Sequence, residues 1–391
     1  MTTSDAHSQP LAKRLLTSLA PGLVIACLSV LLAAAVVEVY CRINPPAGVY
    51  YGGSVPDQAI GVRYRPYSTI VYTKAGERVD SLVNRDGFLD ADHAGDKPPG
   101  SVRVGFFGDS YVEALQVPLE QRFFRRLPDR VQAVPFEYFG FGMSGFGTVH
   151  SYLNARVWDK TYDLDAVVYV FVENDPGDNI ARINKNPRRP FALPADEEPG
   201  FTIDRSFEER NRLLDTFPYN FLRNIKNRSF ALQIVQHRLS LLPPAGASSA
   251  PASQSNAVSP PSLASDPNEN DLPGAWNESD RAYAGRLGRA ILTEWAREAR
   301  TQGRRFYVLY MPRGSKFLST EPAGKTWKPW LMETCRALNI QVIDPSEAFL
   351  KRERSGVPVY VDHLTAQGHA VLGEALQGWL ETVVIDRFLP M

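Results

Sequence analysis

Cysteine is scarce in this sequence, with three residues among 391, and the chain has no excess charge of either sign. Three cysteines do not make a disulfide scaffold, and two of them, Cys27 and Cys41, lie in or beside a long apolar run. Only Cys335 lies well inside the part expected to fold, and no Cys/His spacing typical of zinc is present. Lysine and arginine (43) balance aspartate and glutamate (43), so the basic field that nucleic-acid binders need is missing. We therefore expect no nucleic-acid partner.

Charged residues are also missing from one long segment near the N-terminus. Residues 15–37 contain none and are rich in Leu, Ala and Val, which is enough for a helix to cross a hydrocarbon core of about 30 Å. Lys13 and Arg14 precede this segment, whereas Arg42 is the only basic residue soon after it. The positive-inside rule then predicts a single-pass anchor in the cytoplasmic (inner) membrane, with the rest of the chain in the periplasm or outside the cell.

Two other interpretations of this segment remain open. A signal peptide would be cleaved near the small residues 33–35, and a lipoprotein would use Cys27 after residues 24–26, although strong hydrophobicity continues beyond that cysteine. All three interpretations export the remainder of the chain.

Downstream of residue 100, apolar runs alternate with segments of helical periodicity. Near-continuous apolar runs are typical of buried parallel strands, and strand–helix alternation predicts a parallel sheet covered on both faces. We therefore predict an α/β protein: a three-layer α/β/α sandwich with a parallel, flavodoxin-like sheet of five strands, plus the N-terminal transmembrane helix. The strands are expected at 102–107, 136–139, 166–171, 305–310 and 340–343, and the helices at 119–131, 148–158, 281–302, 327–338 and 365–384.

Composition divides the chain further. A region rich in Pro, Gly and Tyr precedes the core, and a long insertion interrupts the core. Within the insertion we predict an amphipathic helix at 219–238. A later segment of Ser, Pro, Ala and Asn has too few apolar residues to fold into an ordered structure. The predicted parts are a cytoplasmic N-terminus (1–14), an anchor (15–41), a lead-in or stalk (42–100), a first half of the core (101–180), an insertion (181–278) with a disordered loop at about 243–275, and a second half of the core (279–391).

Residues that carry chemistry are sought at the carboxyl ends of the strands, where open α/β sheets place their sites. The first strand ends in Gly108-Asp109-Ser110, where a serine at a helix N-terminus is a candidate nucleophile, although Asp and Ser are also ordinary helix caps. The second ends in a glycine-rich run that includes Gly142, which is either an anion-binding turn or merely a flexible one. The third ends in Glu173-Asn174-Asp175, and His363 precedes the last helix. His369 is expected to be structural or simply exposed.

In combination, these four pieces resemble the blocks of the SGNH/GDSL hydrolase family, over roughly residues 80–180 and 280–385. The resemblance implies that Ser110 is the nucleophile and His363 the general base. It also implies that the backbone N–H groups of Ser110 and Gly142, together with the Asn174 side chain, form the oxyanion hole. The family's catalytic aspartate corresponds to Asp362.

Two positions depart from the family pattern. Val172 stands where glycine is usual, and Asp362 immediately precedes His363 instead of lying two or three residues before it. Neighbouring side chains of an extended segment point in opposite directions, so a Ser–His dyad is an alternative, with a backbone carbonyl or a carboxylate such as Asp344 holding the ring.

The resemblance implies an ester hydrolase that forms an acyl-serine intermediate and needs no metal or organic cofactor. The expected substrate is an acylated carbohydrate, with O-acetyl groups of an envelope or exported polysaccharide as the target, although lipid and other esters remain open. The alternatives are an O-acetyltransferase that uses the same site and an inactive accessory protein that binds glycan in an export complex. Expected partners are the membrane, through the N-terminal helix, and a membrane-embedded acyl-transfer or export protein.

Overall fold

A computed structural model gives the structure of the chain. The residues it describes are 11–74, 77–184, 186–195, 200–240, 278–312, 326–361 and 363–387. The disordered loop predicted at about 243–275 and the predicted catalytic residue Asp362 lie outside the described residues.

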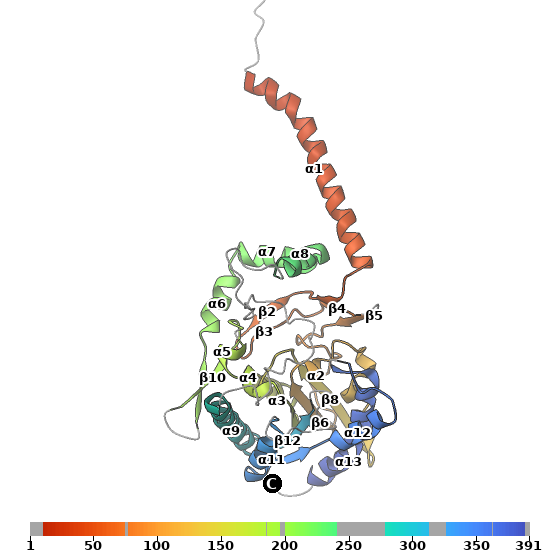
Figure 1. The fold of residues 1–391 in the computed structure, drawn as a ribbon, viewed down its shortest axis with the longest axis vertical. Helices are drawn as coiled ribbons and strands as arrows, with labels where there is room; N and C mark the ends of the chain where they lie inside the picture. Colours follow the sequence, from red (N-terminus) through yellow and green to blue (C-terminus); the bar gives the residue numbers. More distant parts are fainter. Residues whose placement is uncertain are drawn as a thin grey trace, which may run out of the picture.

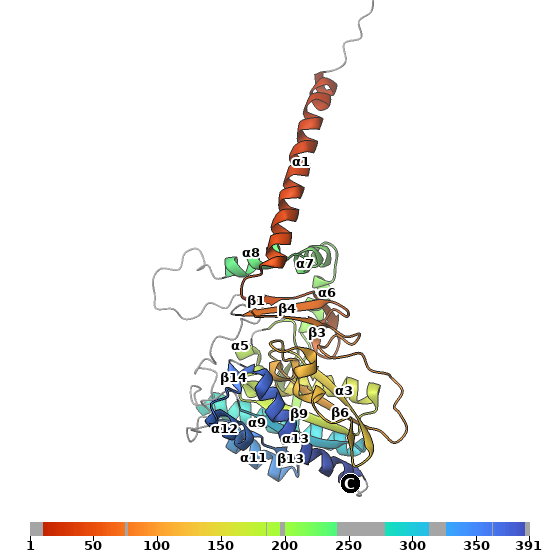
Figure 2. The same ribbon diagram turned by 90° about the vertical axis from the view of Figure 1, so that its right-hand side faces the viewer.

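Helix α1 (Leu11–Ile43) projects away from the globular part as a single long rod (Figures 1 and 2). A window of 18 residues within its segment Pro21–Ile43 has a mean hydropathy of 2.5, and none of this window is buried against the rest of the protein. Among the described residues it is the one helix that is long and apolar enough to cross a membrane, which fits either a single-pass anchor or a signal sequence.

The lead-in lies between α1 and the core and consists of two small antiparallel sheets. One has the order β1-β4-β5 (Gly48–Tyr50, Thr69–Lys74 and Glu77–Leu82), and the other pairs β2 (Ser54–Asp57) with β3 (Gly61–Tyr64). Because Ile60, Tyr64 and Ile70 belong to the same apolar cluster as the core, the lead-in packs directly on the central sheet and its helices.

The central sheet contains all five predicted strands, and they are parallel to one another. They are β6, β8, β9, β12 and β13 (Val102–Gly108, Val134–Gly142, Ala166–Val172, Arg305–Met311 and Gln341–Ile343). The order β13-β12-β9-β6-β8-β7 is the flavodoxin-like order with one addition. The prediction of a purely parallel five-stranded sheet was wrong in this respect: a sixth strand, β7 (Arg130–Val131), pairs antiparallel with β8 at the edge.

Two apolar clusters, one on each face of the sheet, make the predicted three layers. Alternate residues of β9 point to opposite faces, so Val167 and Tyr169 belong to one cluster and Val168 and Val170 to the other. Helices α3 (Thr148–Tyr162), α9 (Glu278–Thr301) and α11 (Lys328–Ala337) supply the first cluster. Helices α12 (Ser346–Arg354) and α13 (Ala366–Arg387) supply the second.

The helix predicted at 119–131 is absent, and this prediction was wrong. Two short 3₁₀ turns, η1 (Leu119–Gln121) and η2 (Phe123–Arg125), take its place before β7. Prolines 118 and 128 bracket this segment, and both Phe123 and Phe124 are fully buried against Phe106. Packing two adjacent phenylalanines into one core favours tight turns over a regular helix, whose adjacent side chains diverge.

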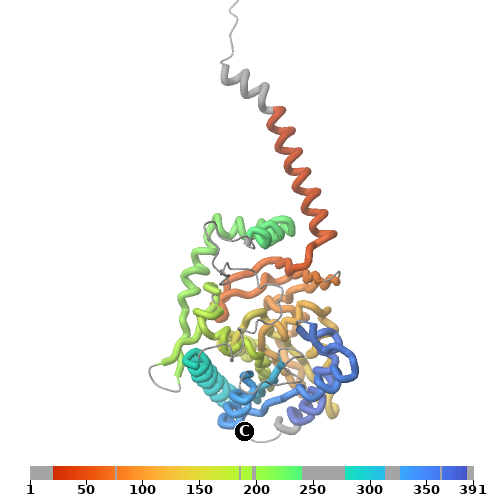
Figure 3. The backbone as a smooth tube through the Cα atoms, viewed as in Figure 1, coloured from red at the N-terminus to blue at the C-terminus, as the bar shows by residue number. Residues whose placement is uncertain are grey.

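The insertion runs along one side of the molecule and reaches the end from which α1 leaves (Figure 3). Its helix predicted at 219–238 is divided at Ser229, which adopts extended backbone angles, into α7 (Tyr219–Arg228) and α8 (Phe230–Ser240). Its other elements are α5 (Ala181–Asn184), β10 (Phe191–Pro194), β11 (Phe201–Asp204) and α6 (Phe207–Leu214), and α4 (Asp175–Asp178) lies just before it.

Candidate active site

Ser110 is the first residue of the short helix α2 (Ser110–Glu113), directly after β6. Asp109 caps this helix, because its Oδ1 accepts a hydrogen bond from the backbone N–H of Tyr111 at 2.9 Å. Asp109 is buried and caps the helix, whereas Ser110, the nucleophile expected from the sequence, is partly exposed to solvent.

His363 lies beside Ser110 although 253 positions separate them in the chain. Its Nε2 is 2.9 Å from the Ser110 Oγ, and both side chains are partly exposed. The histidine comes from β15 (His363–Leu364), which pairs with β14 (Tyr360–Val361). This is the spacing and chemistry of a nucleophile with its general base.

Two contacts from the region after Ser110 hold the histidine strand in place. The Gln116 side-chain amide donates a hydrogen bond to the backbone carbonyl of Leu364 at 2.9 Å. The centroids of the Tyr111 and His363 rings are 5.0 Å apart. The alternative carboxylate, Asp344, accepts hydrogen bonds from Ser346 and forms an ion pair with Lys328 at 3.0 Å. Whether Asp362 orients the ring stays a prediction.

Gly142 ends β8 directly opposite Gly108 in the parallel register. A Cβ atom at this position would lie 2.2 Å from the backbone nitrogen of Glu113 and 2.6 Å from Val112, which is closer than real atoms approach. Glycine therefore allows the end of β8 to pack against α2, next to Ser110.

Asn174 follows β9 at the same edge of the sheet, and its side-chain amide points toward carboxylates. Its Nδ2 donates to Asp178 at 2.7 Å and, with a longer bond of 3.3 Å, to Asp109. Burial raises the pKa of Asp109 to about 7, so near neutral pH much of this carboxyl is uncharged and accepts the hydrogen bond more weakly. Asn174 is thus held mainly through Asp178, while its other N–H, which makes the longer bond to Asp109, is the one more easily redirected to a different acceptor.

Asp175, the neighbour of Asn174, turns away from the edge and into the protein. One of its oxygens accepts hydrogen bonds from the Tyr169 hydroxyl at 2.5 Å and from the Val172 backbone N–H at 3.0 Å. Burial raises the pKa of this carboxyl well above its ordinary value. Asp175 therefore supports the strand end that presents Asn174.

Glu113 is a site residue that the sequence analysis missed. This buried carboxylate accepts hydrogen bonds from the Tyr64 hydroxyl and from both the hydroxyl and the backbone N–H of Ser144, the latter at 3.2 Å. Burial raises the pKa of Glu113 above its ordinary value, although its hydrogen bonds oppose this effect. Arg189, from the insertion, holds the same loop by donating to the Ser144 carbonyl at 2.8 Å and to the Gly145 carbonyl. Because these partners come from the lead-in and the insertion, no local sequence pattern identifies the cluster.

Replacing Glu113 by alanine should both destabilise the protein and slow catalysis. The Tyr64 and Ser144 groups would lose their acceptor inside the protein, which costs about 2–4 kcal/mol of unfolding free energy. The loop after Gly142 would also lose its link to α2, so kcat should fall. Thermal unfolding in detergent and ester hydrolysis measure the two effects, and Glu120→Ala, at an exposed position of η1, is the control. Wild-type stability in Glu113→Ala would contradict the role assigned to this carboxylate.

His369 is structural, as expected from the sequence. It is fully buried, its Nδ1 accepts the backbone N–H of Phe123 at 3.2 Å, and burial together with nearby arginines lowers its pKa to about 3. Over the part of the chain that the structure describes, no group of three or more His, Cys, Asp or Glu side chains is arranged to hold a metal ion.

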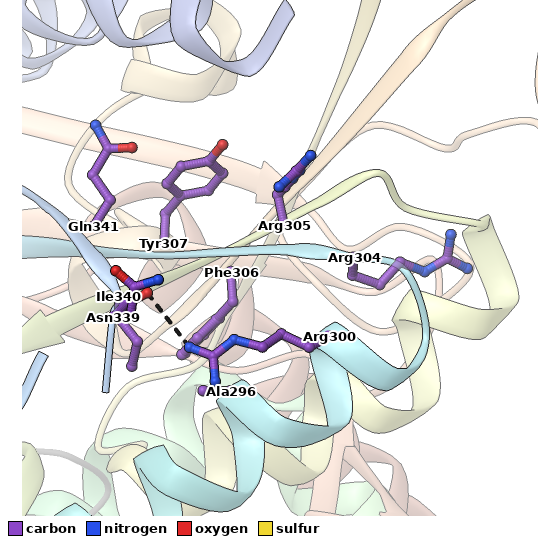
Figure 4. Close-up of a pocket in the computed structure, with 9 residues that line it drawn as sticks. All are labelled: Ala296, Arg300, Arg304, Arg305, Phe306, Tyr307, Asn339, Ile340 and Gln341. Atoms are coloured by element: carbon purple, nitrogen blue, oxygen red, sulfur yellow. Dashed lines mark hydrogen bonds between the residues drawn. The ribbon is translucent and has the colours of Figure 1, made fainter. Parts of the chain in front are cut away.

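A separate hollow lies at the opposite edge of the sheet, where β12 and β13 begin (Figure 4). Arginines 300, 304 and 305 line it, but Arg300 donates to backbone carbonyls of Leu338 and Asn339, and Arg304 pairs with Asp159 and Asp163. These partners explain Arg300 and Arg304 as structural, and none of the predicted site residues lines this hollow.

No family model matches the chain, and no curated protein does. Among solved structures, TesA is similar to it with 11% identity and a TM-score of 0.38, over 72% of this chain and 99% of that one. The acetyl xylan esterase AlAXEase is similar with 13% identity and a TM-score of 0.37, over 71% and 100% of the two chains. A GDSL-like lipase from Bacteroides thetaiotaomicron is similar with 11% identity and a TM-score of 0.35, over 74% and 92%.

Proposed function

We propose that this protein is a serine ester hydrolase of the SGNH type, acting on O-acetyl groups of an envelope or exported polysaccharide. The observation that carries the proposal is the 2.9 Å contact between the Ser110 hydroxyl and the His363 imidazole at the carboxyl edge of the sheet. A serine that begins a helix, within hydrogen-bond reach of a histidine and accessible to solvent, has the parts needed for acyl transfer.

In the first half of the reaction, His363 Nε2 takes the proton of Ser110 as the Oγ attacks the ester carbonyl carbon. The carbonyl oxygen becomes an oxyanion, which the backbone N–H groups of Ser110 and Gly142 and the amide of Asn174 stabilise. As the intermediate collapses, the carbon–oxygen bond to the alcohol breaks and His363 returns its proton to the leaving oxygen. The products are a free sugar hydroxyl and an acyl-serine.

In the second half, a water molecule attacks the acyl-serine while His363 takes its proton. The bond to Ser110 breaks, the serine regains its proton from His363, and the carboxylic acid leaves. If a sugar hydroxyl took the place of water, the same site would act as an O-acetyltransferase.

The cellular setting belongs to the same proposal. The apolar surface of α1 supports a single-pass anchor, and the charge asymmetry around it supports an N-terminus in the cytoplasm with the catalytic part outside. This location favours an envelope or exported polysaccharide as the substrate and a membrane-embedded acyl-transfer or export protein as the partner.

Covalent labelling tests the proposal on the full chain in detergent micelles. A fluorophosphonate probe should attach to one residue, Ser110, and the unlabelled protein should hydrolyse a short-chain aryl acetate. Mass spectrometry after incubation with an acetyl donor and an oligosaccharide separates the products of hydrolysis from those of transfer. Absence of labelling together with retained glycan binding would overturn the proposal in favour of an inactive glycan-binding protein.

A further inference from the structure

Helices α7 and α8 turn their apolar side chains away from the protein. They lie on the lead-in at the end of the globular part from which α1 leaves (Figures 1 and 2). Six large apolar side chains of this helix pair are 43–61% exposed: Phe221, Leu222, Ile225, Leu232, Val235 and Leu239. Tyr219 is 60% exposed, and Phe217, just before α7, is 80% exposed.

The opposite faces of the two helices carry polar contacts with the rest of the protein. On α7, Asn224 accepts a hydrogen bond from Arg65, and Arg223 donates to Asp215 at 2.9 Å. On α8, the Gln233 side chain bonds to both the N–H and the carbonyl of Tyr51, at 2.9 and 3.2 Å. Surface helices of soluble proteins normally pack their apolar face inward, so this orientation is reversed.

The beginning of α8 is fastened to the far end of α1. The Glu38 carboxylate accepts the backbone N–H groups of Phe230 and Ala231, at 3.0 and 3.1 Å, and the Ser229 hydroxyl at 2.8 Å. Arg42 donates to the Arg228 carbonyl, and its guanidinium lies over the Phe230 ring at 5.0 Å from the ring centre. A helix from the insertion is therefore capped by a carboxylate of the membrane helix.

The position of Glu38 sets the level of this attachment. It is the first charged residue after the uncharged stretch 15–37, and exposed Val39, Tyr40 and Ile43 follow it, so it lies near the end of the apolar surface of α1. Helices α7 and α8, with their exposed apolar side chains, lie at this end of α1 (Figures 1 and 2). Exposed Arg228 and Arg238 flank them, as basic residues flank helices that lie in a membrane surface.

We propose that α7 and α8 lie in the surface of the lipid bilayer and, together with α1, hold the catalytic domain in one orientation to the membrane. This inference rests on the membrane anchor of the proposed function. Tyr64 of the lead-in donates a hydrogen bond to Glu113 beside the site, so the lead-in connects α7 and α8 to the carboxyl edge of the sheet. A fixed orientation would present the Ser110 site to substrate at a constant height above the bilayer.

Fluorescent labels on single cysteines test this placement in the full chain, reconstituted into vesicles of phosphatidylcholine and phosphatidylglycerol. Cys27→Ser and Cys41→Ser remove the accessible native thiols, and Cys335 is buried. Leu222→Cys and Val235→Cys then carry an environment-sensitive dye, with Val157→Cys on α3, 40% exposed, as the matched control. A Cys41→Ser variant, labelled at Cys27, reports whether α1 lies in the bilayer.

We expect the dyes at positions 222 and 235 to shift to shorter wavelength and to lose about half of their emission to brominated acyl chains, while the dye at 157 stays in water. If the dyes at 222 and 235 stayed unquenched like the one at 157, while a dye at Cys27 was quenched, the surface placement of α7 and α8 would be overturned and the membrane anchor would stand. An unquenched Cys27 would overturn the anchor and this inference together. Shielding of 222 and 235 in native membranes but not in pure lipid would assign the surface to a protein partner instead.

Discussion

Ser110→Ala abolishes ester hydrolysis: we expect kcat for a short-chain aryl acetate to fall on the order of 10⁴-fold or more, with thermal stability unchanged. In the proposed mechanism the Ser110 Oγ attacks the substrate, and in the structure His363 Nε2 lies 2.9 Å from this oxygen. Because Ser110 is partly exposed, removing one oxygen leaves no buried group without a partner. Steady-state kinetics of the full chain in detergent give the result.

Two further variants sharpen this test. His363→Gln should lose nearly as much activity, and the double variant should lose little more than either single one, because nucleophile and base act as a unit. Ser355→Ala, at an exposed serine after α12, is the matched control and should keep wild-type kcat. If Ser110→Ala kept more than about a tenth of the wild-type rate, Ser110 would not be the nucleophile.

Asn174→Ala should lower kcat by about 10²–10³-fold and change KM little, because an oxyanion donor acts mainly in the transition state. Asn174→Asp should be at least as damaging, since a third carboxylate would then face Asp109 and Asp178. Kinetics of both variants and their melting temperatures separate a loss of chemistry from a loss of folding.

Asn184→Ala is the matched control for this prediction. The Asn184 amide also donates to Asp178, at 2.7 Å, but it is not one of the oxyanion donors proposed here. If both alanine variants lost the same activity, the effect would come from a disturbed Asp178, and Asn174 would not be assigned to the oxyanion hole.

Much of the core could be predicted because its signals are local. The strand 166–171 is a continuous apolar run, as a strand buried on both faces requires, and the structure gives β9 over Ala166–Val172. The edge strand β7 has two residues and an exposed Arg130, so it carries no such signal. The two turns found in place of the helix predicted at 119–131 depend on how Phe123 and Phe124 pack against Phe106 in the core. The hydrophobic periodicity of the sequence does not encode this packing.

The sequence by itself determined the five parallel strands and the apolar segment near the N-terminus, because both are continuous local patterns. It also determined the candidate residues Ser110, Gly142, Asn174 and His363, because each lies in a short pattern beside a predictable element. Only the tertiary structure decided that Ser110 and His363 meet, since strand order joins segments 253 residues apart. It also decided the Glu113 cluster and the outward apolar faces of α7 and α8. The Glu113 cluster needs partners from three separate regions of the chain. The exposure of the apolar faces depends on which side of each amphipathic helix contacts the protein, and the hydrophobic periodicity of the sequence is the same in either case.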